Sequence, residues 1–152
     1  MSELRTNRII PRDGLPSGSS GGIIQVKSTT KTDTFSSSTT GSFVDVTGLA
    51  VTITPHRADS KILVTAMCSV GNSGTGTRSG MRLVRDSTPI AVATDVGNRT
   101  AASFGTFNAH GNAANTQVPA YVQFLDSPAT TSAVTYKICL LYTSDAADDR
   151  VS

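Results

Sequence analysis

The 152-residue sequence contains no tryptophan, only two cysteines and a single glutamate, and 16% of its residues are charged. It has no run of about 18 apolar residues, so we expect no transmembrane helix and no membrane insertion. Its net charge of +2 is too small to predict a nucleic-acid surface. With only Cys68 and Cys139 available, we expect no disulfide framework in a chain made in the cytoplasm.

Residues 1–22 lack the apolar segment of a signal peptide, so we expect synthesis in the cytoplasm without secretion through such a peptide. Residues 17–22 form a Gly/Ser run, which loses too much conformational entropy to become ordered alone. Upstream of this run, Leu4, Ile9 and Ile10 form an apolar patch too small to fold alone. We interpret residues 1–22 as an N-terminal arm and linker that docks on a partner.

From residue 23 onward, apolar and polar residues alternate, as they do on strands whose successive side chains point to opposite faces. The alternating segments are residues 23–26, 43–46, 49–54, 62–69, 81–84, 90–92, 121–125 and 134–138. Turn signals lie between them, among them Thr47-Gly48 and residues 86–89. Threonine and serine are abundant, and no apolar helical spacing occurs before residue 139. The sequence predicts an all-β, antiparallel β-sandwich domain over residues 23–138.

Residues 139–152 look foreign to the rest of the chain. Codons can be chosen for residues 139–149 that reproduce a transposon-end adapter used in short-read DNA sequencing. The alternative is a genuine strand followed by an acidic tail. We predict that residues 139–152 are a non-native read-through tail, so that the C-terminus is truncated and further strands are missing. Residues 139–143 are still apolar enough to extend a strand, whereas the tail from Ser144 onward is expected to pack poorly.

Metal and cysteine chemistry have little support in the sequence. His56 and His110 are the only histidines, and neither has a partner at ligand spacing. A structural zinc site needs about four nitrogen or sulfur ligands, so we predict no metal and no cofactor. Cys68 lies in the middle of an alternating segment, where a buried cysteine behaves as a small apolar residue.

Two further patterns favour structural roles over catalysis. The glycine-rich residues 71–80 lack the Lys of a phosphate-binding loop and precede a strand-like segment, so we interpret them as a strand connection. Asp86, Asp95 and Asp126 could supply the two carboxyl groups of a glycoside hydrolase. Ser, Gly or Pro lies within two residues after each of them, which favours turn capping. We therefore predict that the protein is not an enzyme.

Several segments resemble small tail-fibre and structural proteins of marine bacteriophages. They are residues 2–11, 22–26, 41–49, 83–90 and 125–131. The resemblance covers nearly all of residues 1–138, and its motifs are turn and strand motifs. It implies a jelly-roll-like sandwich similar to C1q or TNF heads, which is often trimeric. Such proteins usually continue with further strands where this chain reaches Ile138.

The resemblance implies a non-enzymatic virion component, a tail-fibre or host-adhesion domain located on the virion. The N-terminal arm would contact other virion proteins or trimerise, and the β domain would face a host cell-surface glycan. Three alternatives remain open. The protein could be a particle-decorating structural protein, a carbohydrate-binding module, or a depolymerase, which would need a catalytic pair that the sequence does not offer.

The longest polar connections, residues 71–80 and 98–116, are the predicted receptor surface, because sandwich loops are free to vary while strands hold the core. Their amide, imidazole and guanidinium groups suit sugar hydroxyls and belong to Asn108, His110, Asn112, Asn115 and Arg78. An apolar contact face could come from Phe104, Phe107 and Tyr121. The alternative is that the aromatic residues belong to the core and the asparagines to turns.

The sequence also predicts a homotrimer. A period-two domain with five Phe and no Trp has limited apolar area for a monomer, and association compensates for that deficit in small all-β chains. Three copies would also cover open sheet edges, and a three-fold ring suits a fibre tip.

Overall fold

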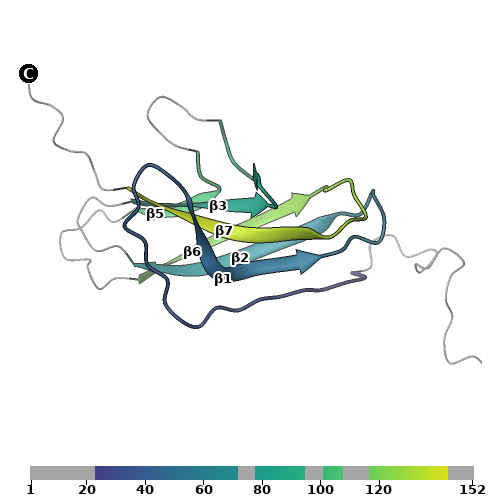
Figure 1. Ribbon diagram of the computed structural model, residues 1–152, viewed down its shortest axis with the longest axis horizontal. Coiled ribbons are helices and arrows are strands. Elements are labelled where there is room, and N and C mark those ends of the chain that lie inside the picture. The colour runs from purple at the N-terminus through teal and green to yellow at the C-terminus, as the bar shows by residue number, and fades with distance from the viewer. Residues whose placement is uncertain (1–22, 72–77, 95–100, 108–116, 144–152) are drawn as a thin grey trace, which may run out of the picture.

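The structure is a computed structural model that describes residues 23–71, 78–94, 101–107 and 117–143. These residues form seven β-strands (Figure 1). The strands are β1 (Val44–Ile53), β2 (Ile62–Gly71), β3 (Arg78–Arg85), β4 (Thr88–Ile90), β5 (Phe104–Phe107), β6 (Gln117–Asp126) and β7 (Val134–Thr143). Within the described ranges, no helix is long and apolar enough to cross a membrane.

Five strands form one antiparallel sheet, called sheet A here, in which β7 lies between β1 and β3. The other edge of β3 is shared by two short strands. β5 pairs with residues 78–81 of β3, and β4 pairs with residues 83–85. The remaining strands, β2 and β6, form sheet B, an antiparallel ribbon paired from Ile62↔Asp126 to Gly71↔Gln117.

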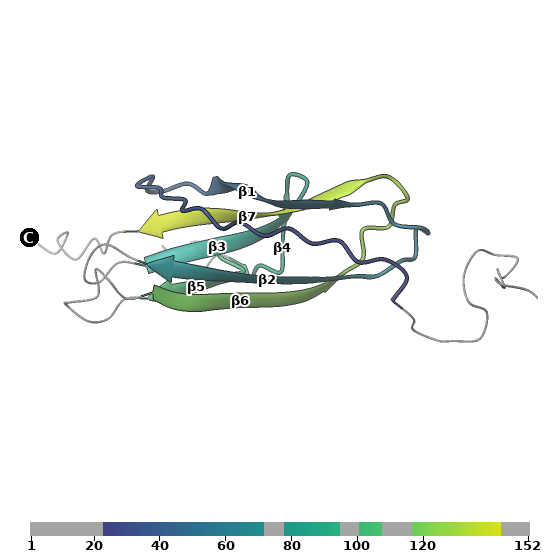
Figure 2. The same ribbon diagram turned by 90° about the horizontal axis from the view of Figure 1, so that it is seen from below.

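The two sheets lie face to face as two layers, with β1, β7 and β3 in one layer and β2 and β6 in the other (Figure 2). This arrangement confirms the prediction of an all-β antiparallel sandwich. The finer jelly-roll prediction stays a prediction.

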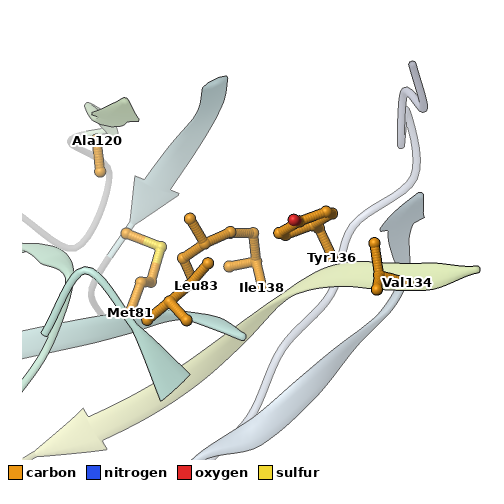
Figure 3. Packing of buried hydrophobic residues seen from close by; sticks show 7 residues of the cluster. Met81, Leu83, Ala120, Val134, Tyr136 and Ile138 are labelled. Atoms are coloured by element: carbon orange, nitrogen blue, oxygen red, sulfur yellow. The ribbon is translucent and has the colours of Figure 1, made fainter. Parts of the chain in front are cut away.

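The hydrophobic core lies between the layers. Met81 and Leu83 of β3 are its most deeply buried large side chains, and they lie beside Tyr136 and Ile138 of β7 (Figure 3). Burying a side chain of this size stabilises the fold by about 1.5–3 kcal/mol. The inward row of β2 packs against this cluster and consists of Ile62, Val64, Ala66, Cys68 and Val70. The period-two pattern predicted the first four of these residues as one row.

One predicted turn is instead an irregularity inside a strand. Thr47-Gly48 was expected to separate two strands, but both segments belong to the single strand β1. The register of β1 on β7 shifts between Asp45 and Ala50, and Gly48 has a φ of 85°. A glycine with positive φ suits a bulge as well as a turn, so only pairing along one partner strand distinguishes the two.

The edge of β3 contains a strand that the sequence pattern did not predict. Residues 98–116 were expected to form a polar connection, but β5 lies within them. Ser103 joins the two short strands on this edge. Its hydroxyl accepts from the Leu83 N–H (2.9 Å) and donates to the Ile90 carbonyl (2.9 Å), while its own N–H donates to the Met81 carbonyl (2.8 Å).

The predicted opening strand at residues 23–26 is wrong. No strand is formed there, and Ile23 and Val26 are 85% and 75% exposed. The segment that follows runs beside β1 and β2 (Figure 2), and residues 27–29 lie near Val51 and Val64. Apolar composition alone does not make a strand when no neighbouring strand supplies hydrogen bonds.

β7 runs through to Thr143 and therefore crosses the predicted boundary between residues 138 and 139. Cys139 and Leu141 are buried within it. The expectation that residues 139–143 extend a strand is confirmed. The residues from Ser144 onward lie outside the described part of the chain.

Candidate functional site

Two connections that lie within the predicted receptor segments 71–80 and 98–116 begin and end at the same end of the sandwich. Residues 72–77 join β2 to β3, and residues 108–116 join β5 to β6. Arg78, at the start of β3, pairs with Phe107 at the end of β5, and Gly71 pairs with Gln117. Figures 1 and 2 show β2 ending, and β3 and β6 beginning, at this same end of the sandwich, which we call the loop end.

Most of the predicted receptor residues lie outside the described residues. These are Asn108, His110, Asn112 and Asn115. Arg78 is described, and it is an exposed residue of the loop end, where it also pairs with Thr143 of β7. The structure therefore brings Arg78 to the base of both connections.

The predicted aromatic face divides between two places. Phe104 is partly buried and packs against the core, as expected if it is structural. Tyr121 is 55% exposed on the outer side of sheet B, away from the core. The two side chains therefore do not form one contact face.

Close backbone approach fixes the anchor of residues 108–116. A Cβ at Gly105 would lie 2.6 Å from the Ser79 carbonyl oxygen, which is closer than real Cβ atoms come. Glycine at this position lets β5 lie directly against β3. The position of Phe107, where residues 108–116 begin, therefore depends on Gly105.

A buried polar cluster links the two sheets near the opposite end. The Arg85 Nη1 atom of β3 lies 2.8 Å from both carboxylate oxygens of Asp126 on β6. The Tyr136 hydroxyl of β7 donates to Asp126 Oδ2 at 2.6 Å. Burial, together with the neighbouring Asp126 carboxylate, raises the pKa of Tyr136 above its ordinary value. The Asp126 oxygens are thus engaged by residues of sheet A, which favours a structural role over acid–base chemistry.

The other two candidate carboxylates do not join this cluster. Asp86 follows β3 in a two-residue connection to β4, with a φ of 54°. Its carboxylate accepts from the Thr135 N–H at 2.9 Å, and its own N–H donates to the Thr135 carbonyl at 2.7 Å. Aspartate tolerates this left-handed conformation, so the turn role predicted for Asp86 fits. Asp95 lies outside the described residues.

Both cysteines are free thiols on different sheets, and neither is activated. Burial raises the pKa of Cys68, which lies on the inward row of β2 as predicted. Burial and a hydrogen bond donated to Asp45 (3.0 Å) raise the pKa of Cys139 to about 12. His56 is exposed, and among the described residues no group of three His, Cys, Asp or Glu side chains could hold a metal ion.

A half-open cavity of about 180 Å³ lies beside β1 and β2, under residues 27–29. It is smaller than the roughly 300 Å³ at which small-molecule sites begin. Its lining includes Val51, Val64, Leu83 and Ile138. We therefore interpret the cavity as a continuation of the hydrophobic core that opens to solvent beside β1 and β2.

No protein-family model matches the chain, and no curated protein or solved structure matches it.

Proposed function

We propose that the protein is a non-enzymatic virion component of a bacteriophage, acting as a tail-fibre or host-adhesion domain. The observation that carries this proposal is the difference between the two ends of the sandwich. The described chain begins at Ile23 at one end, whereas both receptor connections are anchored at the other (Figures 1 and 2). An arm bound to the particle at residues 1–22 would therefore direct the loop end toward the host.

The proposed ligand is a host cell-surface glycan. Arg78 contributes a guanidinium group at the base of the two connections, and Asn108 and Asn112 contribute amides. Amides donate and accept hydrogen bonds at once, which matches sugar hydroxyls, and guanidinium pairs with sugar carboxylates. The homotrimer is proposed as the assembly that multiplies such weak contacts.

A particle-decorating structural protein is the second candidate function. The exposed apolar outer face of sheet B favours it, because large apolar surfaces are normally covered by assembly. A carbohydrate-binding module outside the virion is the third, and it would bind glycan without any contact to particle proteins.

Binding of the complete 152-residue chain to an array of bacterial surface polysaccharides tests the proposal. We expect binding to at least one polysaccharide, weakened about tenfold or more by N108A/H110A/N112A/N115A, a loss of about 1.4 kcal/mol. The control is T54A/H56A, which changes two exposed residues at the opposite end.

Absence of binding to every polysaccharide would favour the decorating function. An equal loss in the control variant would remove the loop end as the receptor site. Glycan binding that persists without any contact to isolated phage particles would favour the carbohydrate-binding module.

A further inference from the structure

The outer face of sheet B is large, apolar and uncharged. Its alternate positions on β2 and β6 are occupied by Leu63, Thr65, Met67, Ser69, Pro119, Tyr121, Gln123 and Leu125. Four of these side chains are more than half exposed: Leu63 at 60%, Met67 at 74%, Tyr121 at 55% and Leu125 at 58%. Exposed apolar patches of this kind on a protein surface are often functional.

Pairing of the two strands arranges these residues in rows across the face. Leu63 lies opposite Leu125, Thr65 opposite Gln123, and Met67 opposite Tyr121. Rows on one side of a strand pair are about 6.6–6.8 Å apart. Two apolar rows therefore flank one uncharged polar row at equal distances.

This order of rows is self-complementary. Two copies can stack face to face about a two-fold axis that lies between them and runs parallel to the Thr65–Gln123 row. This axis places the Thr65–Gln123 row of one copy against the same row of the other copy. Both apolar rows then meet apolar rows of the other copy. The Gln123 amide and the Thr65 hydroxyl can donate and accept across the interface, so neither is buried without a partner.

The absence of charge argues against the two terminal segments of the chain as occupants of this face. Residues 1–22 carry Glu3, Arg5, Arg8, Arg12 and Asp13, and residues 144–152 carry three aspartates and an arginine. Either segment would bring several charges onto rows that carry none, and Lys61, just beyond the Leu63–Leu125 row with its Nζ on the Ser127 hydroxyl, could pair with few of them. Burying unpaired charges costs free energy. A basic, acidic or nucleic-acid partner is disfavoured for the same reason.

The area of the face limits how strong a contact between two copies can be. A ribbon of ten residue pairs covers roughly 330 Å² in plan, from a rise of about 3.3 Å per residue and a width of about 10 Å. A standard stable interface buries about 800 Å² per partner. A face of this size is well below that standard, so it supports only a weak, reversible contact.

We propose that the outer face of sheet B is the surface on which a second copy of this chain packs, face to face. This contact is separate from the glycan binding at the loop end. It is also separate from a trimer formed through the N-terminal arm, because the face belongs to sheet B, and two units that close on each other through such faces have twice the mass of one.

The mass of the complete chain by light scattering, measured over a concentration series, tests the proposal. We expect the mass to double as concentration rises, and M67K/L125K to abolish the doubling. The matched control T47K/T54K adds the same two charges at exposed positions of β1 and beside it, and it should still double. Far-ultraviolet circular dichroism checks that each variant keeps its strands.

M67Q/L125Q provides a neutral second variant should the lysine pair unfold the chain, and it should weaken the doubling about tenfold or more. A wild-type mass that stays constant up to millimolar concentration overturns the proposal. Doubling that survives in M67K/L125K, or disappears equally in T47K/T54K, also overturns it.

Discussion

The outer faces of the two sheets differ in how far other parts of the chain cover them, although their strands share the same alternating pattern. On sheet A, Val84 and Cys139 occupy outward positions and are nonetheless buried. The Phe43 ring lies 4.0 Å from the Arg82 guanidinium carbon, and Arg82 Nε donates to the Ala101 carbonyl at 2.8 Å. On sheet B, the equivalent positions leave four large apolar side chains exposed.

The cover of sheet A comes from chain segments outside its strands. A Cβ at Gly80 would lie 3.4 Å from Ala102 and 3.9 Å from Phe43, so both segments cross over this part of the sheet. Aromatic and cationic side chains hold them there, since a ring face attracts a guanidinium group. Whether an outward-facing residue of a strand is buried therefore depends more on which chain segments cross over the sheet than on whether that residue is polar or apolar.

The largest expected effect on stability comes from breaking the polar contacts that link the two sheets. D126A removes the carboxylate that joins sheet B to Arg85 and Tyr136, leaving a largely buried guanidinium and a hydroxyl without their acceptor. We expect a loss of about 3–5 kcal/mol in the free energy of unfolding, measured by urea denaturation. D59A removes only the exposed pair with Arg57 and should cost far less, because solvent screens that pair. Similar losses in the two variants would contradict the buried cluster.

A matched pair of substitutions measures the difference in cover directly. V84T places a hydroxyl at a buried outward position of sheet A and should cost about 1–3 kcal/mol of unfolding free energy. L63T also places a hydroxyl at an outward position, on the exposed face of sheet B and in a shorter side chain, and should stay within about 0.5 kcal/mol in a dilute, unassociated chain. If L63T costs as much as V84T at low concentration, the face of sheet B is covered within one chain.

Much of the fold could be predicted from the sequence, because alternation reports which side of a strand meets the core. The rows of β2 and β7 were predicted in this way. The short strand β5 was missed because FGTF has little alternation to detect, and its pairing depends on the distant edge of β3. Residues 23–26 show the converse, since they have the apolar residues of a strand without a neighbour to pair with.

The candidate sites were less predictable, for a related reason. The convergence of the two polar connections follows from the pairing of Arg78 with Phe107, which no local pattern contains. The exposed face of sheet B had a signal in the sequence, namely outward positions without a single charge on two long strands. That signal becomes a surface only when the register places Leu63 beside Leu125.

The smallest expected effect concerns the charges on the outer face of sheet A. Asp45 accepts from the Cys139 thiol and lies 2.6 Å from Lys137 Nζ, and these two contacts, the thiol first, lower the pKa of Asp45. A lowered folded-state pKa means that the stabilisation is present above the ordinary aspartate value of about 3.9 and is lost as the pH falls through the folded value. Since the Asp45 side chain is 58% exposed, solvent screening limits the contribution to less than about 1 kcal/mol.

The difference in unfolding free energy between wild type and D45N isolates this contribution from the other carboxylates. We expect wild type to be slightly more stable at about pH 6, and the difference to shrink toward zero as the pH falls well below about 3.9. Added salt should reduce it at neutral pH, because the Asp45–Lys137 pair is open to solvent. D33N offers a matched control, since Asp33 has a lowered pKa through Lys31 but lies outside both sheets. If the stability advantage of wild type over D45N grows as the pH falls, Asp45 is stabilised in its protonated form. The contacts of a charged Asp45 with Cys139 and Lys137 would then be wrong.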